Sequence, residues 1–479
     1  MECRVPKDFE LLLHDSLPDY AADALFGSFG SSAAVSVRLN PLKPVSGFKV
    51  VDDAADPVPW CGDAFFLGQR KSFTLDPLFH AGAYYVQDSS SMFPYLLKDL
   101  ISEAAKDGAV LDLCASPGGK STHLISLLKD LAPLTVVNEA VGKRVPPLCD
   151  NIAKWGASNV IVTSTSASAL GRMDGFFSVI LADVPCSGEG MFRKSEDALS
   201  LWSIGAVKDC AALQRSIIGD IWPSLREGGL LIYSTCTYNH FENQDNVKYI
   251  AEHLGADFVP VDEAALSSVK GLVKLPWGYQ FVPGLVPGEG QFFAVLRKNS
   301  GSGRKAMRQA KGRKARFVAA GEGGLVLDRV SGQVYMLPDD SSFDFGLAVE
   351  FANQMSEINP SCIRTLGCRV GEIKAGKIVP DADLALSNAL AGAENGRFCV
   401  DSGVLGKEAA VEFSSAEIDL ETALKFLSRE NITPQPSWPR GYILLKYRSL
   451  GLGFVNNLGN RCNSLLPLMR RILNKHQNI

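Results

Sequence analysis

The sequence predicts an α/β fold in which a mostly parallel, doubly wound sheet is flanked by further domains at both ends. Between about residues 104 and 298, short apolar segments with the composition of strands alternate with segments of helical pattern. That alternation is typical of a parallel sheet with helices on both faces. The chain has 479 residues, which at about 150 residues per domain suggests roughly three domains.

The strands of the central block can be read in order. Strands are expected at residues 109–114, 134–139, 159–163, 176–183 and 228–235, with a late edge strand at 291–298. A glycine loop follows the first strand and opens a helix that runs to about residue 130. Further helices are expected from the second strand to about Trp155 and over residues 206–225. This order is that of repeated strand–helix units.

The composition is that of an ordinary globular protein. No segment approaches the roughly 20 apolar residues needed to cross a bilayer. The opening MECRVPKDFE lacks the apolar core of a signal peptide, so a cytoplasmic protein without a membrane partner is expected. The eleven cysteines are scattered and no Cys-x-x-Cys pair occurs, so neither a disulfide framework nor a bound metal is expected.

The net charge of −4 does not by itself suggest a nucleic-acid binder, but the charge is unevenly distributed. Nine Lys or Arg residues and no acid occur from Arg297 to Arg316. No acid follows Glu430, whereas these basic residues do: Arg440, Lys446, Arg448, Arg461, Arg470, Arg471 and Lys475. The first run could equally be a solvated linker. Two such stretches on an acidic chain favour a local contact with a polyanion.

The strand at 228–235 ends on Ser234-Thr235-Cys236-Thr237, a single thiol among hydroxyl groups. Free cysteine behaves as a small hydrophobe and is often buried, so Cys236 could simply pack. Alternatively, Cys236 is a nucleophile held at the carboxyl edge of the sheet, where open α/β sheets bind ligands. The tetrapeptide alone favours packing, and further motifs are needed to decide.

The segment DLCASPGGKSTH, residues 112–123, contains a loop suited to binding a ligand. Glycines let the backbone approach a ligand, and the following helix presents free N–H groups to it. The spacing matches neither a Walker loop nor a G-x-G-x-x-G fingerprint, and a plain turn is the alternative. Glu139, at the tip of the second strand, occupies the place of a ribose-binding carboxylate, although it could also cap the next helix. Loop and acid together favour an adenosyl ligand without a pyrophosphate, and S-adenosylmethionine is the obvious candidate.

A second thiol, Cys186, follows the strand at 176–183 in the segment ILADVPCSGEGMFRK. That strand ends on Asp183, so a carboxylate and a thiol leave the same half of the sheet as Cys236. Two thiols near one edge are difficult to ascribe to packing. A Cys/His hydrolase is the rival interpretation, with His240, four residues after Cys236, as the one plausible nearby base.

Four segments closely resemble the RNA 5-methylcytosine methyltransferases of the NOL/Sun family: VLDLCASPGGKSTHL, VNEAVGKR, DVPCSGEGMFRK and YSTCTYNHFENQDN. The layout is most similar to the bacterial RsmF type, which modifies cytosines in 16S ribosomal RNA. Upstream, SVRLNPLK and YYVQDSSSMFP resemble the N-terminal RNA-binding lead-in of that family. Downstream, WPRGYILLKYRSLGLGFVNNLGNRCNSLLP resembles its PUA-like RNA-binding module. The paired PCSG and STCT motifs are highly specific, whereas the glycine loop alone is not.

The resemblance implies a class I, Rossmann-like domain that uses S-adenosylmethionine, and a covalent mechanism. Carbon 5 of cytosine is too electron-poor to attack a methyl sulfonium until a thiolate adds to carbon 6. The family pattern assigns that addition to Cys236, a hydrogen bond or proton to ring nitrogen 3 to Asp183, and help in removing the carbon 5 proton to Cys186. The implied cofactor-binding residues are Cys114, Ala115, Ser116, Pro117, Gly118, Gly119, Lys120, Glu139, Ser166 and Asp183.

Two positions depart from the family pattern. Ser166 stands where the family usually carries an Asp that contacts adenine, and Val184 stands where it usually carries Ala. A serine can still form a hydrogen bond, whereas Val184 could crowd the base slightly. Neither change removes a reacting group.

These observations predict methyl transfer from S-adenosylmethionine to carbon 5 of cytosine in RNA, with 16S ribosomal RNA as partner, by a monomer. The alternatives are a transfer-RNA methyltransferase and an RNA-binding ribosome assembly factor that has lost catalysis. The intact Cys186, Asp183 and Cys236 argue against that loss. The expected domains are an RNA-binding lead-in at 1–100, a methyltransferase domain at 101–298, a basic linker at 299–316 and a C-terminal RNA-binding region at 317–479 that ends in a PUA-like module from about 434.

Overall fold

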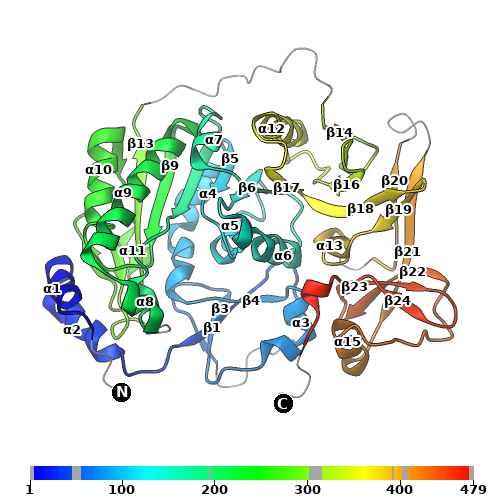
Figure 1. Cartoon of the computed structure of the whole chain (residues 1–479), viewed down its shortest axis with the longest axis horizontal. Helices are drawn as coiled ribbons and strands as arrows, with labels where there is room; N and C mark the ends of the chain where they lie inside the picture. The colour runs from blue at the N-terminus through cyan, green and yellow to red at the C-terminus, as the bar shows by residue number, and fades with distance from the viewer. Residues whose placement is uncertain are drawn as a thin grey trace.

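A ten-stranded sheet organises the described part of the chain (Figure 1). The structure is a computed structural model, and it describes residues 5–45, 55–193, 196–300, 315–390, 393–401 and 408–473. The strands lie in the order β11-β12-β13-β9-β8-β5-β6-β7-β17, and β10 pairs with β13. The neighbours from β9 to β7 are parallel. The predicted doubly wound α/β fold is therefore confirmed.

The elements of the central block follow the predicted order closely. The parallel strands are β5 (Ala109–Asp112), β6 (Thr135–Asn138), β7 (Val160–Thr163), β8 (Phe177–Asp183) and β9 (Leu225–Thr235). The helices are α4 (Lys98–Ala105), α5 (Gly119–Leu127), α6 (Val145–Trp155), α7 (Ala167–Gly171), α8 (Glu196–Leu201), α9 (Ile204–Ile221), α10 (Gln244–Leu254) and α11 (Glu263–Leu266).

Helices cover both faces of the sheet because successive strand residues point to opposite faces. On β5, Leu111 packs in one core with residues of α7, α9 and α10. Its neighbour Val110 packs in a second core with residues of α4, α5 and α11. A strand buried on both faces needs apolar residues at every position, which explains the continuous apolar runs in the sequence.

The expectation of an edge strand at 291–298 is wrong. β13 (Gln291–Lys298) lies antiparallel beside β9, and on its other side it pairs with β12 (Gly278–Phe281) and β10 (Ala256–Phe258). β11 (Val273–Leu275) forms that edge of the sheet. The three added strands have only three or four residues each, too few for a periodic pattern to show in the sequence.

The N-terminal residues form two helices and a small sheet. Helices α1 (Lys7–Ser16) and α2 (Asp19–Ser28) share a core with Trp202 and Tyr238, next to the end of β9. The four-stranded sheet has the order β2-β3-β1-β4. Its elements, with the helix between β3 and β4, are β1 (Val35–Leu39), β2 (Asp56–Pro57), β3 (Ala64–Leu67), α3 (Pro77–His80) and β4 (Tyr84–Val86).

The C-terminal region contains two five-stranded sheets, in the orders β14-β15-β16-β18-β19 and β20-β21-β22-β23-β24. The first comprises β14 (Phe317–Ala319), β15 (Leu325–Asp328), β16 (Gln333–Met336), β18 (Cys368–Lys374) and β19 (Lys377–Pro380). The second comprises β20 (Asn395–Val400), β21 (Ala409–Glu417), β22 (Gly441–Tyr447), β23 (Leu450–Asn457) and β24 (Cys462–Ser464). Helices α13 (Ala382–Ala385) and α15 (Leu420–Leu427) accompany them. The second sheet thus begins upstream of residue 434, and most of the predicted basic linker (301–314) lies outside the described residues.

The C-terminal region also contributes to the central sheet, beyond the expected boundary at 298. Strand β17 (Ile363–Leu366) pairs antiparallel with β7 and forms the second edge of the sheet. Helix α12 (Phe345–Ile358) packs on one face, where the rings of Phe351 and Phe176 stack with centroids 5.1 Å apart. Figure 1 shows α12 and β17 beside the parallel strands. The sheet is therefore completed by residues far downstream of its other strands.

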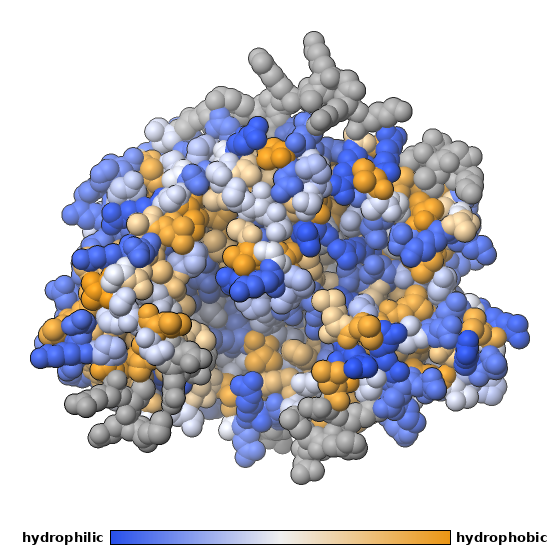
Figure 2. Space-filling model, viewed as in Figure 1, coloured by the Kyte–Doolittle hydropathy of each residue, from blue (hydrophilic) through white to orange (hydrophobic). Residues whose placement is uncertain are grey.

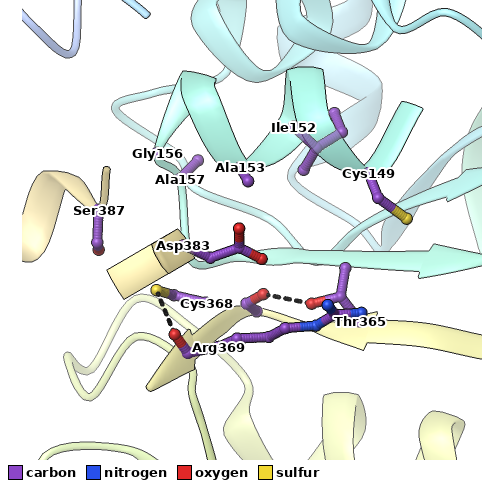
Figure 3. Close-up of a pocket in the computed structure, with 11 residues that line it drawn as sticks. Cys149, Ile152, Ala153, Gly156, Ala157, Thr365, Cys368, Arg369, Asp383 and Ser387 are labelled. Atoms are coloured by element: carbon purple, nitrogen blue, oxygen red, sulfur yellow. Dashed lines mark hydrogen bonds between the residues drawn. The ribbon is translucent and has the colours of Figure 1, made fainter. Parts of the chain in front are cut away.

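Polar contacts secure the junction of all three regions near the end of α6. The buried Lys43 donates to the carbonyl oxygens of Ala81, Lys154 and Leu386. Figure 3 shows the small cavity nearby, where Cys149 and Ile152 of α6 face Cys368 and Asp383. Its volume is about 20 Å³, which is room for about one water molecule. This cavity therefore lies where α6 meets the C-terminal region, and we regard it as a packing gap in that junction.

The surface gives two further observations. In the part of the chain that the structure describes, no helix combines the length and apolar character that a membrane span needs. On the face shown in Figure 2, polar and apolar residues are interspersed and the surface is hollowed near its centre. That face therefore presents a concave region and not one continuous apolar patch.

Candidate active site

The two predicted thiols meet at the carboxyl edge of the central sheet. β8 and β9 are parallel neighbours with Asp183 opposite Ser234, so the turns that follow them leave the sheet side by side. Cys186 lies in the first turn and Cys236 in the second, and their Sγ atoms are 3.3 Å apart. Both cysteines are free and partly buried. The structure therefore places in contact two thiols that are 50 residues apart in the sequence.

A polar cluster surrounds the Asp183 carboxylate. Its Oδ2 accepts a hydrogen bond from the Lys120 ammonium at 2.9 Å. Its Oδ1 accepts from the Ser234 hydroxyl at 2.8 Å and from the Gln291 amide at 3.0 Å. Burial acts to lower the pKa of Lys120, but the charge of Asp183 and its hydrogen bond outweigh burial and raise that pKa. An ion pair is thus held beside the thiols.

The thiols differ in acidity. The pKa of Cys236 lies below its ordinary value, first because the Cys186 thiol donates a hydrogen bond to it, with Lys120 helping against burial and the charge of Asp183. The pKa of Cys186 is raised well above its ordinary value by that same hydrogen bond and then by burial. Because a thiolate is the reactive form of cysteine, the arrangement favours Cys236 as the nucleophile and Cys186 as a proton-bearing neighbour.

A cavity of about 190 Å³ adjoins this cluster. Its lining includes seven of the ten predicted cofactor residues: Cys114, Ala115, Ser116, Pro117, Gly119, Lys120 and Asp183. The remaining lining residues are Tyr85, Val86, Gln87, Asp88, Ser91 and Asp112. Residues 85–91 belong to the segment expected to be an RNA-binding lead-in, so the N-terminal region also forms a wall of this cavity.

The three other predicted cofactor residues lie outside that lining. Gly118 has φ +112° and forms the N-cap of α5, a backbone conformation that favours glycine. Glu139 is buried, and its Oε1 accepts the N–H of Val141 at 2.8 Å, but it caps neither the short helix at Gly142–Arg144 nor α6, so the alternative of a helix cap is not supported. Ser166 is exposed and accepts the N–H of Ala169, which caps α7.

Two buried carboxylate oxygens test whether this edge fits S-adenosylmethionine. Among the described residues, Asp112 Oδ1 and Glu139 Oε2 accept no hydrogen bond, and the one ion pair given for them joins Glu139 Oε2 to Arg144 Nε at 3.6 Å. Burial raises the pKa of Asp112 to about 7, against the hydrogen bond from Ser121. Buried acceptors without donors are unfavourable, so both oxygens suit a ligand that brings an ammonium and ribose hydroxyl groups. The residues present therefore fit the methionine and ribose ends of the cofactor.

Two expectations about neighbouring residues are not supported. Val184 is buried in the apolar core on one face of the sheet, so its extra methyl groups are accommodated by packing and do not crowd a base. His240 pairs through Nδ1 with Asp245 at 2.8 Å and through Nε2 with Asp15 at 3.3 Å. Both ring nitrogens of the proposed hydrolase base are thus engaged by carboxylates.

Several residues of the cluster were not identified from the sequence. Asp112 lies in the quoted glycine-loop segment, and its position at the end of a buried strand was the available signal. Gln291 reaches Asp183 only because β13 pairs with β9 and sets Phe293 opposite Ser234. Such antiparallel pairing leaves no local pattern, so Gln291 had no signal in the sequence.

The fold and the site together define the class of the protein: a class I methyltransferase with two cysteines in contact at the carboxyl edge of its sheet. Three family models match the chain: 16S rRNA methyltransferase RsmB/F over residues 100–297, the N-terminal domain of 16S rRNA methyltransferase RsmF over 5–89, and the methyltransferase RsmF PUA domain over 413–472. The chain belongs to the RsmF family of 16S rRNA methyltransferases.

Individual relatives agree with this membership. Ribosomal RNA small subunit methyltransferase F of Shewanella sp. (strain MR-4) is 30% identical over 487 residues, which cover 96% of this chain and 94% of the relative. The protein of the same description from Aeromonas hydrophila is 28% identical over 450 residues and 90% of each chain. A solved structure of PH0851 aligns with a TM-score of 0.52 and 21% identity over 62% of this chain and 67% of that one, which supports the fold.

Proposed function

We propose that this chain transfers a methyl group from S-adenosylmethionine to carbon 5 of a cytosine in 16S ribosomal RNA. The observation that carries the proposal is the contact between Cys186 and Cys236 beside the Asp183–Lys120 ion pair, which itself lines the glycine-loop cavity. The names of the relatives, ribosomal RNA small subunit methyltransferases, support the choice of RNA. Ribosomal RNA as partner and the cytoplasm as location are part of the same proposal, as are a monomeric state and the division into an N-terminal lead-in, a methyltransferase domain and a C-terminal RNA-binding region.

Each residue of the cluster has a role in this reaction. Cys236, the more acidic thiol, adds to carbon 6 of the base and turns the ring into an enamine. Asp183 is ion-paired in the free protein, which favours accepting a hydrogen bond from the base over donating a proton to it. Asp112 and Glu139 hold the cofactor through its ammonium and ribose hydroxyl groups. When bound, S-adenosylmethionine supplies the electrophilic methyl group.

The release step follows from the same hydrogen bond. Cys186 must remove the proton from carbon 5 so that the bond between Cys236 and carbon 6 can break. In the free protein its pKa is raised most by the hydrogen bond to Cys236. Once Cys236 has become a thioether, it is no longer a thiolate acceptor, so the main cause of that raised pKa is removed. Cys186 can then lose its own proton to solvent and, as a thiolate, take the proton from carbon 5 while the bond between carbon 6 and Cys236 breaks.

Methyl transfer can be measured directly. The purified protein should transfer labelled methyl groups to 16S ribosomal RNA or to small-subunit particles, and bisulfite sequencing of ribosomal RNA from a strain without it should show a lost 5-methylcytosine. Transfer to transfer RNA alone would replace the proposed substrate. Absence of transfer to any RNA, with RNA still bound, would identify a non-catalytic assembly factor.

A further inference from the structure

The two cysteine-bearing turns exchange hydrogen bonds through buried carboxylates. Glu189 lies three residues after Cys186, yet its Oε2 accepts the N–H groups of Tyr238 at 2.8 Å and Asn239 at 3.2 Å in the opposite turn. In return, Glu242 follows Cys236 in the chain, yet its Oε2 accepts the N–H of Ser187 at 3.0 Å, next to Cys186. Each carboxylate therefore fixes the backbone of the turn to which it does not belong.

Further contacts connect this exchange into one network. The Asn239 amide donates to Glu189 Oε1 at 2.9 Å and to Glu242 Oε1 at 2.8 Å. The N–H of Gly190 donates to the carbonyl oxygen of Cys236 at 2.8 Å. A Cβ atom on Gly190 would lie 2.6 Å from that oxygen, so only glycine permits the approach. The backbone on both sides of the thiol contact is thus held by direct hydrogen bonds.

The two carboxylates of this network are buried, and burying a charge opposes folding. Glu189 is 2% exposed and Glu242 is 0% exposed. Within the described ranges, neither carboxylate forms an ion pair with Lys or Arg, and neutral N–H and O–H donors satisfy both. Burial raises the pKa of Glu242, opposed by those hydrogen bonds. Burying carboxylates without a counter-ion is unfavourable, so their presence here points to a requirement for exact placement of the backbone that they hold.

We propose that Glu189 and Glu242 are positioning residues that hold the Cys186 and Cys236 thiols in contact. The Cys186 hydrogen bond is the largest cause of the lowered pKa of Cys236, and it depends on the 3.3 Å separation. Loosening the turns therefore weakens the nucleophile without changing either cysteine. The catalytic roles of the two thiols rest on the proposed function, whereas the way in which the carboxylates hold them does not.

Isosteric amide substitutions provide the test. In Glu242→Gln, the new NH2 group must face either the donors Ser187 and Gln214 or the donor Asn239, so at least one hydrogen bond is lost at constant volume. The same argument applies to Glu189→Gln. Asp328→Asn is the control for a buried carboxylate elsewhere in the chain: Asp328, in β15 of the C-terminal region, is 1% exposed and accepts several hydrogen bonds, two of them from its ion-pair partner Arg316.

The readout is the rate at which iodoacetamide alkylates Cys236 in the full-length protein across a pH series, measured on its peptide by mass spectrometry. Asp183, Lys120, Glu242 and Cys186 all face this thiol. The charge of Glu242 by itself raises the pKa of Cys236. A variant that only lost this charge would therefore be alkylated faster, which is the opposite of the result expected from loosened turns. We expect slower alkylation at neutral pH in both Gln variants, by about tenfold, because a hydrogen bond to a charged group typically contributes at least that factor. Asp328→Asn should leave the rate unchanged.

If both Gln variants fold and their Cys236 is alkylated at the wild-type rate, with the same pH at half-maximal rate, the inference is overturned. If those variants do not fold, Thr237→Val decides, since it keeps the shape but removes the hydroxyl that donates to Glu189 and contacts Ser187. A wild-type rate in Thr237→Val would overturn the inference, and a several-fold fall would support it. The thiol assay contains no RNA, so absence of methyl transfer by the wild-type protein would overturn the proposed function alone.

Discussion

Removing the Cys186 thiol should trap the protein on its RNA. Cys186→Ala slows two steps, the addition of Cys236 to the base and its release, and the step that slows more decides whether the covalent adduct accumulates. Addition slows because Cys236 loses the donor at 3.3 Å that lowers its pKa, and losing a hydrogen bond to a charged group has an effect of about tenfold to a hundredfold. Release slows more, since general-base assistance contributes about a hundredfold to ten-thousandfold. The covalent adduct should therefore form later than in the wild type and persist far longer.

Denaturing gel electrophoresis of the enzyme with cofactor and labelled 16S ribosomal RNA tests this expectation. Cys186→Ala should give a protein–RNA band that survives denaturation, and the double variant with Cys236→Ala should give none. Free turnover of Cys186→Ala without any band would show that Cys186 only packs. If Cys236→Ala alone gave the stable band, the two roles would be reversed.

The remaining predictions concern the nucleophile, the cofactor and RNA. Cys236→Ala should abolish methylation while RNA and cofactor binding, measured by filter retention and calorimetry, persist. Glu139→Ala should weaken S-adenosylmethionine binding about tenfold to a hundredfold in calorimetry, through lost ribose hydrogen bonds. Because the pKa of Asp112 is raised to about 7, cofactor binding below pH 7 should release a proton and affinity should rise as pH increases through 7; Asp112→Asn should remove this dependence. Replacing Arg440, Arg448 and Arg461 together by Ala should flatten the salt dependence of RNA binding, by about 0.7 in slope per lost phosphate contact.

Much of the central fold was predictable because its strands are buried on both faces. Continuous apolar runs predicted β5 to β9 with errors of a few residues at their ends. The short strands β10 to β12 carry no such run, so the neighbours of β13 could not be predicted. Strand β17 pairs with β7 across about 200 residues of chain, and its sequence IRTL shows nothing that would select that partner. Local pattern thus predicts elements well and long-range pairing poorly.

The candidate site divides in the same way. Asp183 ends β8, Cys186 and Cys236 lie in the turns that follow the parallel neighbours β8 and β9, and local motifs predicted that all three would share one edge. Gln291 reaches the site because β13 pairs antiparallel with β9. The N-terminal wall of the cofactor cavity forms because a separate region packs against the sheet. No local motif encodes either contact. Sequence motifs therefore indicate the reacting groups, whereas the residues that orient them become visible only in three dimensions.

The C-terminal region packs against the methyltransferase sheet, and this limits how its role in RNA binding can be tested. The sequence suggests deleting the basic segment from about Pro434, but that deletion would remove β22 to β24 from a five-stranded sheet. It would also remove Arg470, which pairs with Asp150 of α6 and Asp383 of α13, and so weaken a junction beside the methyltransferase sheet.

Two of the basic residues of this segment are already engaged by other parts of the fold. Lys446 is buried and donates to the carbonyl oxygen of Ala393, and Arg470 is engaged in its ion pairs. Arg440, Arg448 and Arg461 are exposed, so substituting these three changes charge without removing a strand. If the triple variant keeps wild-type affinity and salt slope, the segment is a structural cap; a flatter slope with unchanged cofactor affinity identifies it as an RNA contact.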